Sequence, residues 1–163
     1  MTSQEKILQL QGVIDKNIRP LINRDYYLLE VPYYTNIGDT LIWQGELDYL
    51  KTFPHKRIGM YSLESFRYPS IDEKTLIIFQ GGGNFGDLWT KHHDFKMKLV
   101  AHYPKNEFLF MPQTVHFEDE NNLKQCAEFL ANYNITICAR DNVSYKISRI
   151  RFYLFLIWLS IWI

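Results

Sequence analysis

Four short polar segments carry residue types that bind anions or transfer protons. Glycine, amide, aspartate, arginine and histidine are concentrated in residues 36–39 (NIGD), 80–87 (QGGGNFGD), 112–116 (PQTVH) and 140–144 (RDNVS). Each segment follows an apolar run, and in a parallel sheet the strand ends meet at one edge, where helix amino termini offer N–H groups to ligands. We therefore expect one substrate-binding site, with the candidate residues Asn36, Gly38, Asp39, Gly81, Gly82, Gly83, Asn84, Asp87, Gln113 and His116.

Residues 81–86 form a glycine-rich stretch, GGGNFG, that lets the backbone come close to a ligand. Successive N–H groups in such a stretch can bind an anion. The segment has no Gly-Lys-Ser/Thr signature and does not match GxGxxG in its usual register, so nucleotide hydrolysis is not supported. The alternative interpretation is a tight strand-to-helix turn, with Asp87 capping the helix that follows.

Arg140 is the candidate catalytic residue. It follows the apolar run 135–139, where a guanidinium at the mouth of the sheet can hold a carboxylate or a phosphate through two hydrogen bonds. The alternative is an ion pair with Asp141 or another acid. His116, after Pro112, can donate to an anion or shuttle a proton, although a lone loop histidine is more often structural.

The remaining histidines and the cysteines indicate no metal site. His92, His93 and His102 lie in a predicted helix without metal-ligand spacing, so we interpret them as a solvated face with no role. Cys126 and Cys138 stand apart with no CxxC pattern, which argues against zinc and against a disulfide scaffold. We expect both cysteines to be reduced and in the core.

Alternating apolar runs and helical patterns predict the elements that position these residues. Strands are predicted at 26–31, 57–61, 75–79, 108–111 and 135–139, and helices at 4–16, 41–50, 87–102 and 121–131. Asp39 or Thr40 is predicted to cap the second helix, and Pro112 to end the fourth strand. This order predicts an α/β fold, namely a Rossmann-like, doubly wound and mainly parallel sheet with helices on both faces.

Composition limits the classes of function. The chain has 163 residues, of which 47% are hydrophobic, so a single domain is expected. Lys plus Arg and Asp plus Glu number 18 each, and this zero net charge argues against a nucleic-acid partner. The amino terminus lacks a signal-peptide pattern, which predicts a cytoplasmic protein.

Four motifs in this order resemble the polysaccharide pyruvyltransferase family. They are NIGDTLIWQGELDYL, FQGGGNFGDLW, FMPQTVHF and ARDNVSY, and the resemblance covers about residues 26–145. It implies one half of a two-domain enzyme of the GT-B kind that transfers pyruvate as a ketal from phosphoenolpyruvate to a sugar, in exopolysaccharide or cell-wall polymer synthesis. The implied partners are phosphoenolpyruvate and a saccharide or lipid-linked saccharide acceptor, with no cofactor.

The resemblance also implies roles for particular residues. Arg140 is implied as an anion clamp, with Asp39 and residues 81–84 lining the cleft. The family's proton donor is expected in a second domain. We therefore expect residues 1–148 to be the N-terminal, Rossmann-like domain of such an enzyme, and the chain to be a fragment that is inactive alone.

The last fifteen residues, 149–163, form a hydrophobic tail in which eleven of the last twelve are apolar. We prefer a frameshift or truncation product, because a family-like helix is interrupted near Ser148. A short tail anchor at the inner face of the cell membrane is second, although twelve residues are fewer than the ~20 of a spanning helix. A buried C-terminal strand or helix is third.

Two other functions remain open. One is a fragment of a GT-B-type glycosyltransferase, which would share the fold but bind a nucleotide sugar. The other is a non-enzymatic, Rossmann-like binding or interaction module whose glycines serve only as turns. Fold alone does not separate these from a pyruvyltransferase.

Overall fold

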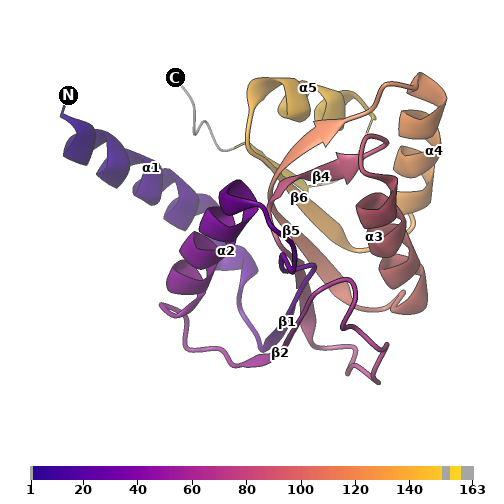
Figure 1. Ribbon diagram of the computed structural model, residues 1–163, viewed down its shortest axis with the longest axis horizontal. Coiled ribbons are helices and arrows are strands. Elements are labelled where there is room, and N and C mark those ends of the chain that lie inside the picture. Colours follow the sequence, from indigo (N-terminus) through magenta and orange to yellow (C-terminus); the bar gives the residue numbers. More distant parts are fainter. Residues whose placement is uncertain (1, 152–154, 159–163) are drawn as a thin grey trace.

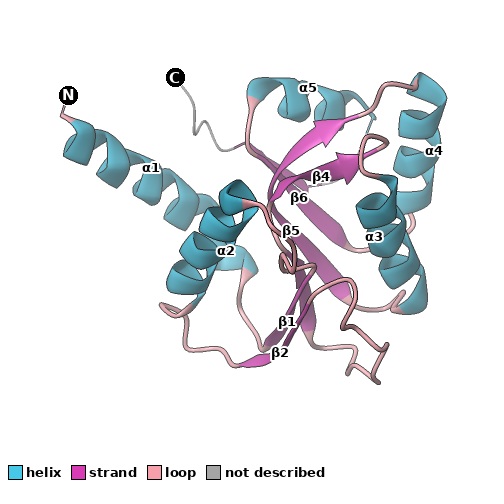
Figure 2. Ribbon diagram, in the orientation of Figure 1, coloured by secondary structure: helices cyan, strands magenta, loops and turns pink. Residues whose placement is uncertain are grey.

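The computed structural model describes residues 2–151 and 155–158 of the chain. Within them, helices and strands alternate as the sequence predicts (Figures 1 and 2). The elements are α1 (Ser3–Ile18), the 3-10 helix η1 (Arg19–Leu21), β1 (Tyr26–Leu29), α2 (Ile37–Leu50), β2 (Arg57–Tyr61), β3 (Leu76–Phe79), β4 (Gly82–Gly86), α3 (Thr90–His102), β5 (Glu107–His116), α4 (Glu120–Leu130), β6 (Ile135–Ala139), α5 (Asn142–Arg151) and β7 (Phe155–Trp158).

The strands form one parallel sheet in the order β2-β1-β3-β5-β6-β7, and β4 pairs with β5 beside this path. Helices α1 and α2 lie against one face and α3 and α4 against the other (Figure 1). Successive residues of a strand point to opposite faces. Accordingly, Leu76 and Ile78 of β3 pack in the core under α1 and α2, whereas Ile77 and Phe79 pack under α3 and α4. The predicted doubly wound fold is confirmed, with β3 and β5 at the centre of the sheet.

The glycine segment is a strand, which corrects the predicted loop. β5 pairs with β3 through Glu107–Phe110 and then with β4 through residues 113–116, so β4 takes the place of β3 further along the same strand. The sequence also predicts that Pro112 ends β5, and this is wrong. β5 continues to His116 because the register of the β5–β6 pairing shifts around Pro112, where no N–H is available to donate.

Helix α2 begins earlier than predicted, and its cap is Asn36 rather than Asp39 or Thr40. The Asn36 side chain accepts hydrogen bonds from the N–H groups of Gly38 (2.9 Å) and Asp39 (3.3 Å). Gly38 and Asp39 therefore lie in the first helical turn, where the negative charge of Asp39 suits the positive end of the helix dipole. Helix α3, in contrast, begins at Thr90 and not at Asp87.

Four residues of the predicted tail form β7, which pairs with β6 in parallel register from Phe155 opposite Thr136 to Trp158 opposite Ala139. Helix α5 ends at Arg151, three residues after Ser148. Residues 152–154 and 159–163 of the tail lie outside the described residues. Among the described residues, no helix is both long and apolar enough to cross a membrane.

Gly86 is predicted to be the least replaceable glycine of the sheet. Its φ is +134°, and a Cβ there would lie 1.6 Å from the carbonyl oxygen of His116, in the strand with which it pairs. Gly86→Ala should lower the free energy of unfolding by on the order of 3 kcal/mol, measured by urea denaturation. The control is Gly12→Ala in α1, which meets no atom within 4 Å and should stabilise the protein by about 0.5–1 kcal/mol. Equal effects of the two variants would contradict this prediction.

Candidate functional site

The candidate site lies at the carboxyl edge of the sheet, where direct contacts join the ends of β3 and β6 to β5. The Gln113 side chain donates from Nε2 to the carbonyl oxygen of Gln80, which follows β3, at 2.7 Å. The N–H of Arg140, which follows β6, donates to the carbonyl oxygen of Gln113 at 3.1 Å. Gln113 is fully buried, so it links the neighbouring strands inside the protein and does not face a ligand.

Arg140 is held by one atom of its guanidinium. Its Nε donates to Thr114 Oγ1 at 2.6 Å, and its Nη2 lies on the side of Gly83, where a Cβ would be 3.9 Å away. The predicted alternative partner, Asp141, instead accepts hydrogen bonds from Ser144 and Thr114 at the start of α5. In the described part of the chain no ion pair is formed by Arg140, so its terminal nitrogens keep the capacity to bind an anion.

Tyr34 joins two of the predicted site residues, Asp39 and Asn84. Its hydroxyl donates to Asp39 Oδ2 at 2.9 Å and accepts from Asn84 Nδ2 at 3.2 Å. Burial is the main cause that raises the pKa of Tyr34 to about 12, so the hydroxyl keeps its proton at neutral pH. Gly82 lies next to Asp39, because a Cβ at Gly82 would be 3.5 Å from Asp39 Oδ1.

Asp39, in the first turn of α2 after its cap Asn36, thus lies next to the glycine strand. Access to that strand is uneven: Gly81 and Gly82 are buried, whereas Gly83 and Asn84 keep exposed surface. The N–H of Gly81 is also taken, since it donates to Glu46 Oε1 at 2.7 Å. The predicted anion-binding backbone is therefore reduced to the stretch around Gly83, opposite Arg140.

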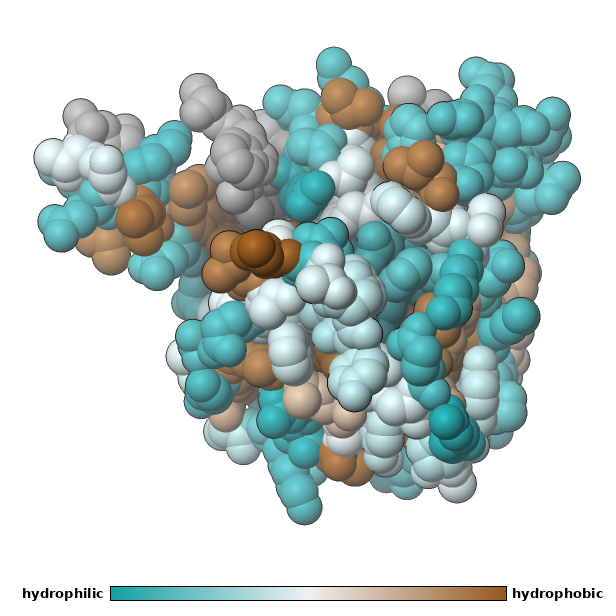
Figure 3. Space-filling model, viewed as in Figure 1, coloured by the Kyte–Doolittle hydropathy of each residue, from teal (hydrophilic) through white to brown (hydrophobic). Residues whose placement is uncertain are grey.

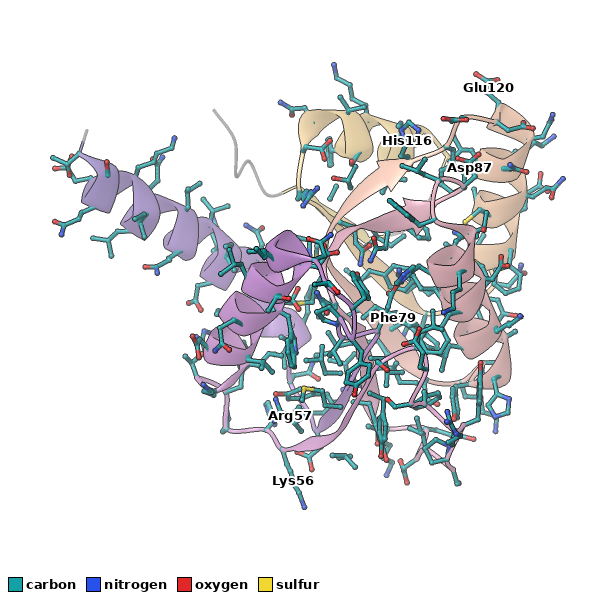
Figure 4. The ribbon with its side chains drawn as sticks, viewed as in Figure 1. Lys56, Arg57, Phe79, Asp87, His116 and Glu120 are labelled. Atoms are coloured by element: carbon teal, nitrogen blue, oxygen red, sulfur yellow. The ribbon has the colours of Figure 1, made fainter. Side chains whose placement is uncertain are left out.

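Asp87 and His116 do not join this group. They lie together at the far end of β4 and β5 (Figure 4). The Asp87 carboxylate accepts hydrogen bonds from the N–H groups of Glu118 (2.8 Å) and Asp119 (3.1 Å), which hold the turn before α4. Burial alone would raise the pKa of Asp87, but these N–H donors bring it below its ordinary value. His116 is exposed and 4.0 Å from Glu118.

A buried ion pair lies beneath the site, and the sequence analysis did not predict it. Lys96 of α3 is fully buried and its Nζ donates to Glu30 Oε1 at 2.7 Å and to the carbonyl oxygen of Asn84 at 3.3 Å. His92 Nδ1 lies 2.8 Å from the same Glu30 oxygen, and its ring packs edge-on against Tyr34. Burial lowers the pKa of Lys96, and the charge of Glu30 opposes this.

The prediction that His92 and His93 belong to a solvated face is therefore wrong. His93 packs against Phe85 and Phe117, and burial lowers its pKa. Of the three histidines in α3, His102 alone is exposed, and its ring packs edge-on against Tyr68. The sequence signal that pointed to burial was the position of His92, His93 and Lys96 on the same face of α3 as the buried Leu99 and Val100.

A mainly apolar groove of about 960 Å³ runs between α1 and α2 and ends at Arg140. Glu46 of α2 lines it together with Pro112, which belongs to β5. Glu46 is 7% exposed, and burial is the main cause that raises the pKa of its carboxyl to about 8. Sequence reasoning missed Glu46 because α2 has no clear polar face, so nothing in its pattern distinguishes a buried glutamate from an exposed one.

The chain is similar to one protein family and to several known proteins. A family profile described as polysaccharide pyruvyl transferase matches residues 36–154, which include all eleven predicted site residues. The chain is 31% identical over 151 residues to the Bacillus subtilis (strain 168) protein named "Putative pyruvyl transferase EpsO", covering 91% of this chain and 45% of that protein.

Two further relatives extend this comparison. The chain is 30% identical over 129 residues to "Pyruvyl transferase 1" of Schizosaccharomyces pombe, covering 72% of this chain and 32% of that protein. It is 31% identical over 162 residues to "General stress protein 30" of Bacillus subtilis, covering 86% of this chain and 46% of that protein. The chain thus spans less than half the length of each of these three relatives.

Removing one partner of the Glu30–Lys96 pair should be costly. Lys96→Met leaves the Glu30 carboxylate buried without its cation and should lower the free energy of unfolding by roughly 3–5 kcal/mol, measured by urea denaturation. Lys98→Met, on the exposed side of the same helix, is the control and should change it by less than about 0.5 kcal/mol. The double variant Glu30→Gln/Lys96→Met should recover part of the loss. If Lys96→Met is no more harmful than Lys98→Met, the pair does not stabilise the fold.

Proposed function

Because this chain belongs to the polysaccharide pyruvyl transferase family, we propose that its α/β unit binds phosphoenolpyruvate through Arg140 for transfer of pyruvate to a sugar. The product is a ketal on a saccharide or lipid-linked saccharide of an exopolysaccharide or cell-wall polymer. A cytoplasmic location, where phosphoenolpyruvate is available, fits this proposal.

The reaction sets the requirements for the site. Protonation of the methylene carbon of phosphoenolpyruvate makes C2 electrophilic, and one sugar hydroxyl adds there and loses its proton. The phosphate then leaves, and a second hydroxyl adds, loses its proton and closes the ketal. The donor carries a carboxylate and a phosphate, so the protein must supply cations or N–H groups.

The observation that carries the proposal is the geometry of Arg140. Its Nε is fixed by Thr114, and its Nη2 lies beside the half-buried Gly83, where a Cβ would be 3.9 Å away. A planar guanidinium held in this way loses little freedom when it binds a carboxylate or phosphate. Asp39 is an anion, so it suits sugar hydroxyls better than the donor, and Tyr34 holds it in place.

We also propose that turnover requires a second protein surface, with residues 1–148 serving as the N-terminal domain. The described residues supply a cation but leave the edge of the site open. Ile37 and Leu41, at the amino end of α2, are 80% and 68% exposed, and they form an apolar patch there in the space-filling view (Figure 3). A facing surface would cover this patch, exclude water and bring the proton donor. On this proposal residues 1–148 bind the donor, and the facing surface completes the site for transfer.

Two variants of Arg140 test the proposed function by calorimetric titration with phosphoenolpyruvate. Arg140→Ala should weaken binding by about 2–5 kcal/mol, because a charged clamp is lost, whereas Arg140→Lys keeps the charge and should lose less. Arg57→Ala is the control, since Arg57 lies at the opposite end of the parallel strands (Figure 4). Unchanged affinity in both Arg140 variants would remove Arg140 from the site. Binding of a uridine diphosphate sugar in place of phosphoenolpyruvate would favour a glycosyltransferase.

A further inference from the structure

Glu46 occupies an unusual position in the wall between the groove and the glycine strand. It lies two turns after Asp39 on the same face of α2, and its Oε1 accepts the N–H of Gly81 at 2.7 Å. Gly81 is tightly enclosed there, because a Cβ would lie 2.7 Å from the carbonyl oxygen of Pro112 and 2.8 Å from Glu46 Oε1. The other oxygen, Oε2, is buried and has no hydrogen-bond partner among the described residues.

Arg140 lines the same groove as Glu46, yet the two do not form an ion pair in the described part of the chain. An ionised carboxylate buried without a partner is costly, and a nearby guanidinium would lower that cost by pairing with it. Glu46 has a buried oxygen without a hydrogen-bond partner and no cation paired with it among the described residues, and a proton on its carboxyl avoids that cost. Arg140 then keeps its charge for an external anion.

We propose that Glu46 is a neutral positioning acid in the wall of the donor site, and that its ionisation lowers the affinity of the site for anionic donors. This inference rests on the proposed function. When protonated, Glu46 holds the Gly81 backbone without adding charge. When ionised, it places a negative charge beside the Gly81 backbone, two residues from Gly83, and repels an anionic donor.

The charged and titratable groups that line the groove with Glu46 are Asp15 of α1, Arg19 of η1, Asp48 and Tyr49 of α2 and Arg140 after β6. The charge that acts on the pKa of Glu46 is that of Glu30, after β1. Burial raises the pKa of Glu46 most, the charge of Glu30 raises it further, and the Gly81 N–H opposes both, to give about 8. The carboxyl therefore keeps its proton at pH 7 and loses it as the pH rises past 8.

The test is calorimetric titration of this chain with phosphoenolpyruvate between pH 7.5 and 9.5, where the phosphate group is already fully ionised. Wild-type affinity should fall with pH, approaching roughly tenfold per pH unit above the pKa of Glu46, and binding there should take up a proton. Glu46→Gln keeps an amide oxygen for Gly81 and stays neutral, so its affinity should not change over this range. Asp48→Asn, on the same helix and groove, is the matched control and should keep the wild-type profile, since the pKa of Asp48 is lowered by its bond to Lys51.

Thermal unfolding gives a second measurement that needs no ligand. The pKa of Glu46 in the folded protein lies above its unfolded value, so the folded state retains a proton that the unfolded state releases between about pH 4.5 and 8. The Tm of the wild type should therefore fall relative to that of Glu46→Gln as the pH rises through this window. A difference in Tm between the wild type and Glu46→Gln that does not change with pH would overturn the proposal that Glu46 is neutral.

The outcomes separate the two proposals. Binding by the wild type without dependence on pH, or an equal pH dependence in Glu46→Gln, would overturn the role of Glu46 and leave the donor site intact. Failure of the wild type to bind phosphoenolpyruvate at any pH would contradict the proposed function and, with it, the effect of Glu46 on donor binding.

Discussion

The cost of burying a charge governs the architecture of the site. Lys96 is fully buried, and a lysine removed from water is stable only with a close partner of opposite charge. Its partner, Glu30, stands directly after β1 with φ +66°, a left-handed conformation that is strained for a residue with a side chain. The ion pair holds this conformation in place, and the contact of Lys96 with the Asn84 carbonyl links β1, α3 and β4 in one unit.

Glycine makes the second contribution, because it lets β4 pack where side chains would not fit. Gly81 passes between Pro112 and Glu46, and Gly86 lies against the His116 carbonyl. These close contacts allow β4 to follow β3 along the same side of β5. The glycine strand then brings Gly83 opposite Arg140, so the function of the glycines is as much to pack the sheet as to face a ligand.

Two buried carboxylates in this region have opposite environments. Glu30 lies within hydrogen-bonding distance of Lys96 and His92, whereas Glu46 has only the neutral N–H of Gly81. The charge of Glu30 is therefore compensated within the core, and a protonated Glu46 adds none. Arg140 and Asp39 are then the charged side chains at the site, and Arg140 is the one that can hold an anion.

Local sequence determined the α/β fold and the position of Arg140, whereas the inner wall of the site depended on tertiary structure. Residues 57–61 and 135–139 form strands with the predicted bounds, because short apolar runs between turns are a local property of the chain. No such signal marks Gly82–Gly86 as a strand, since glycine disfavours strands and β4 exists only through its pairing with β5. The local sequence likewise does not mark the partners of Lys96 and Glu46, because Glu30 and Gly81 lie 66 and 35 residues away from them. Periodicity reports which face of an element is apolar, but the partner of a buried polar group is chosen by the packing of elements that are distant in sequence.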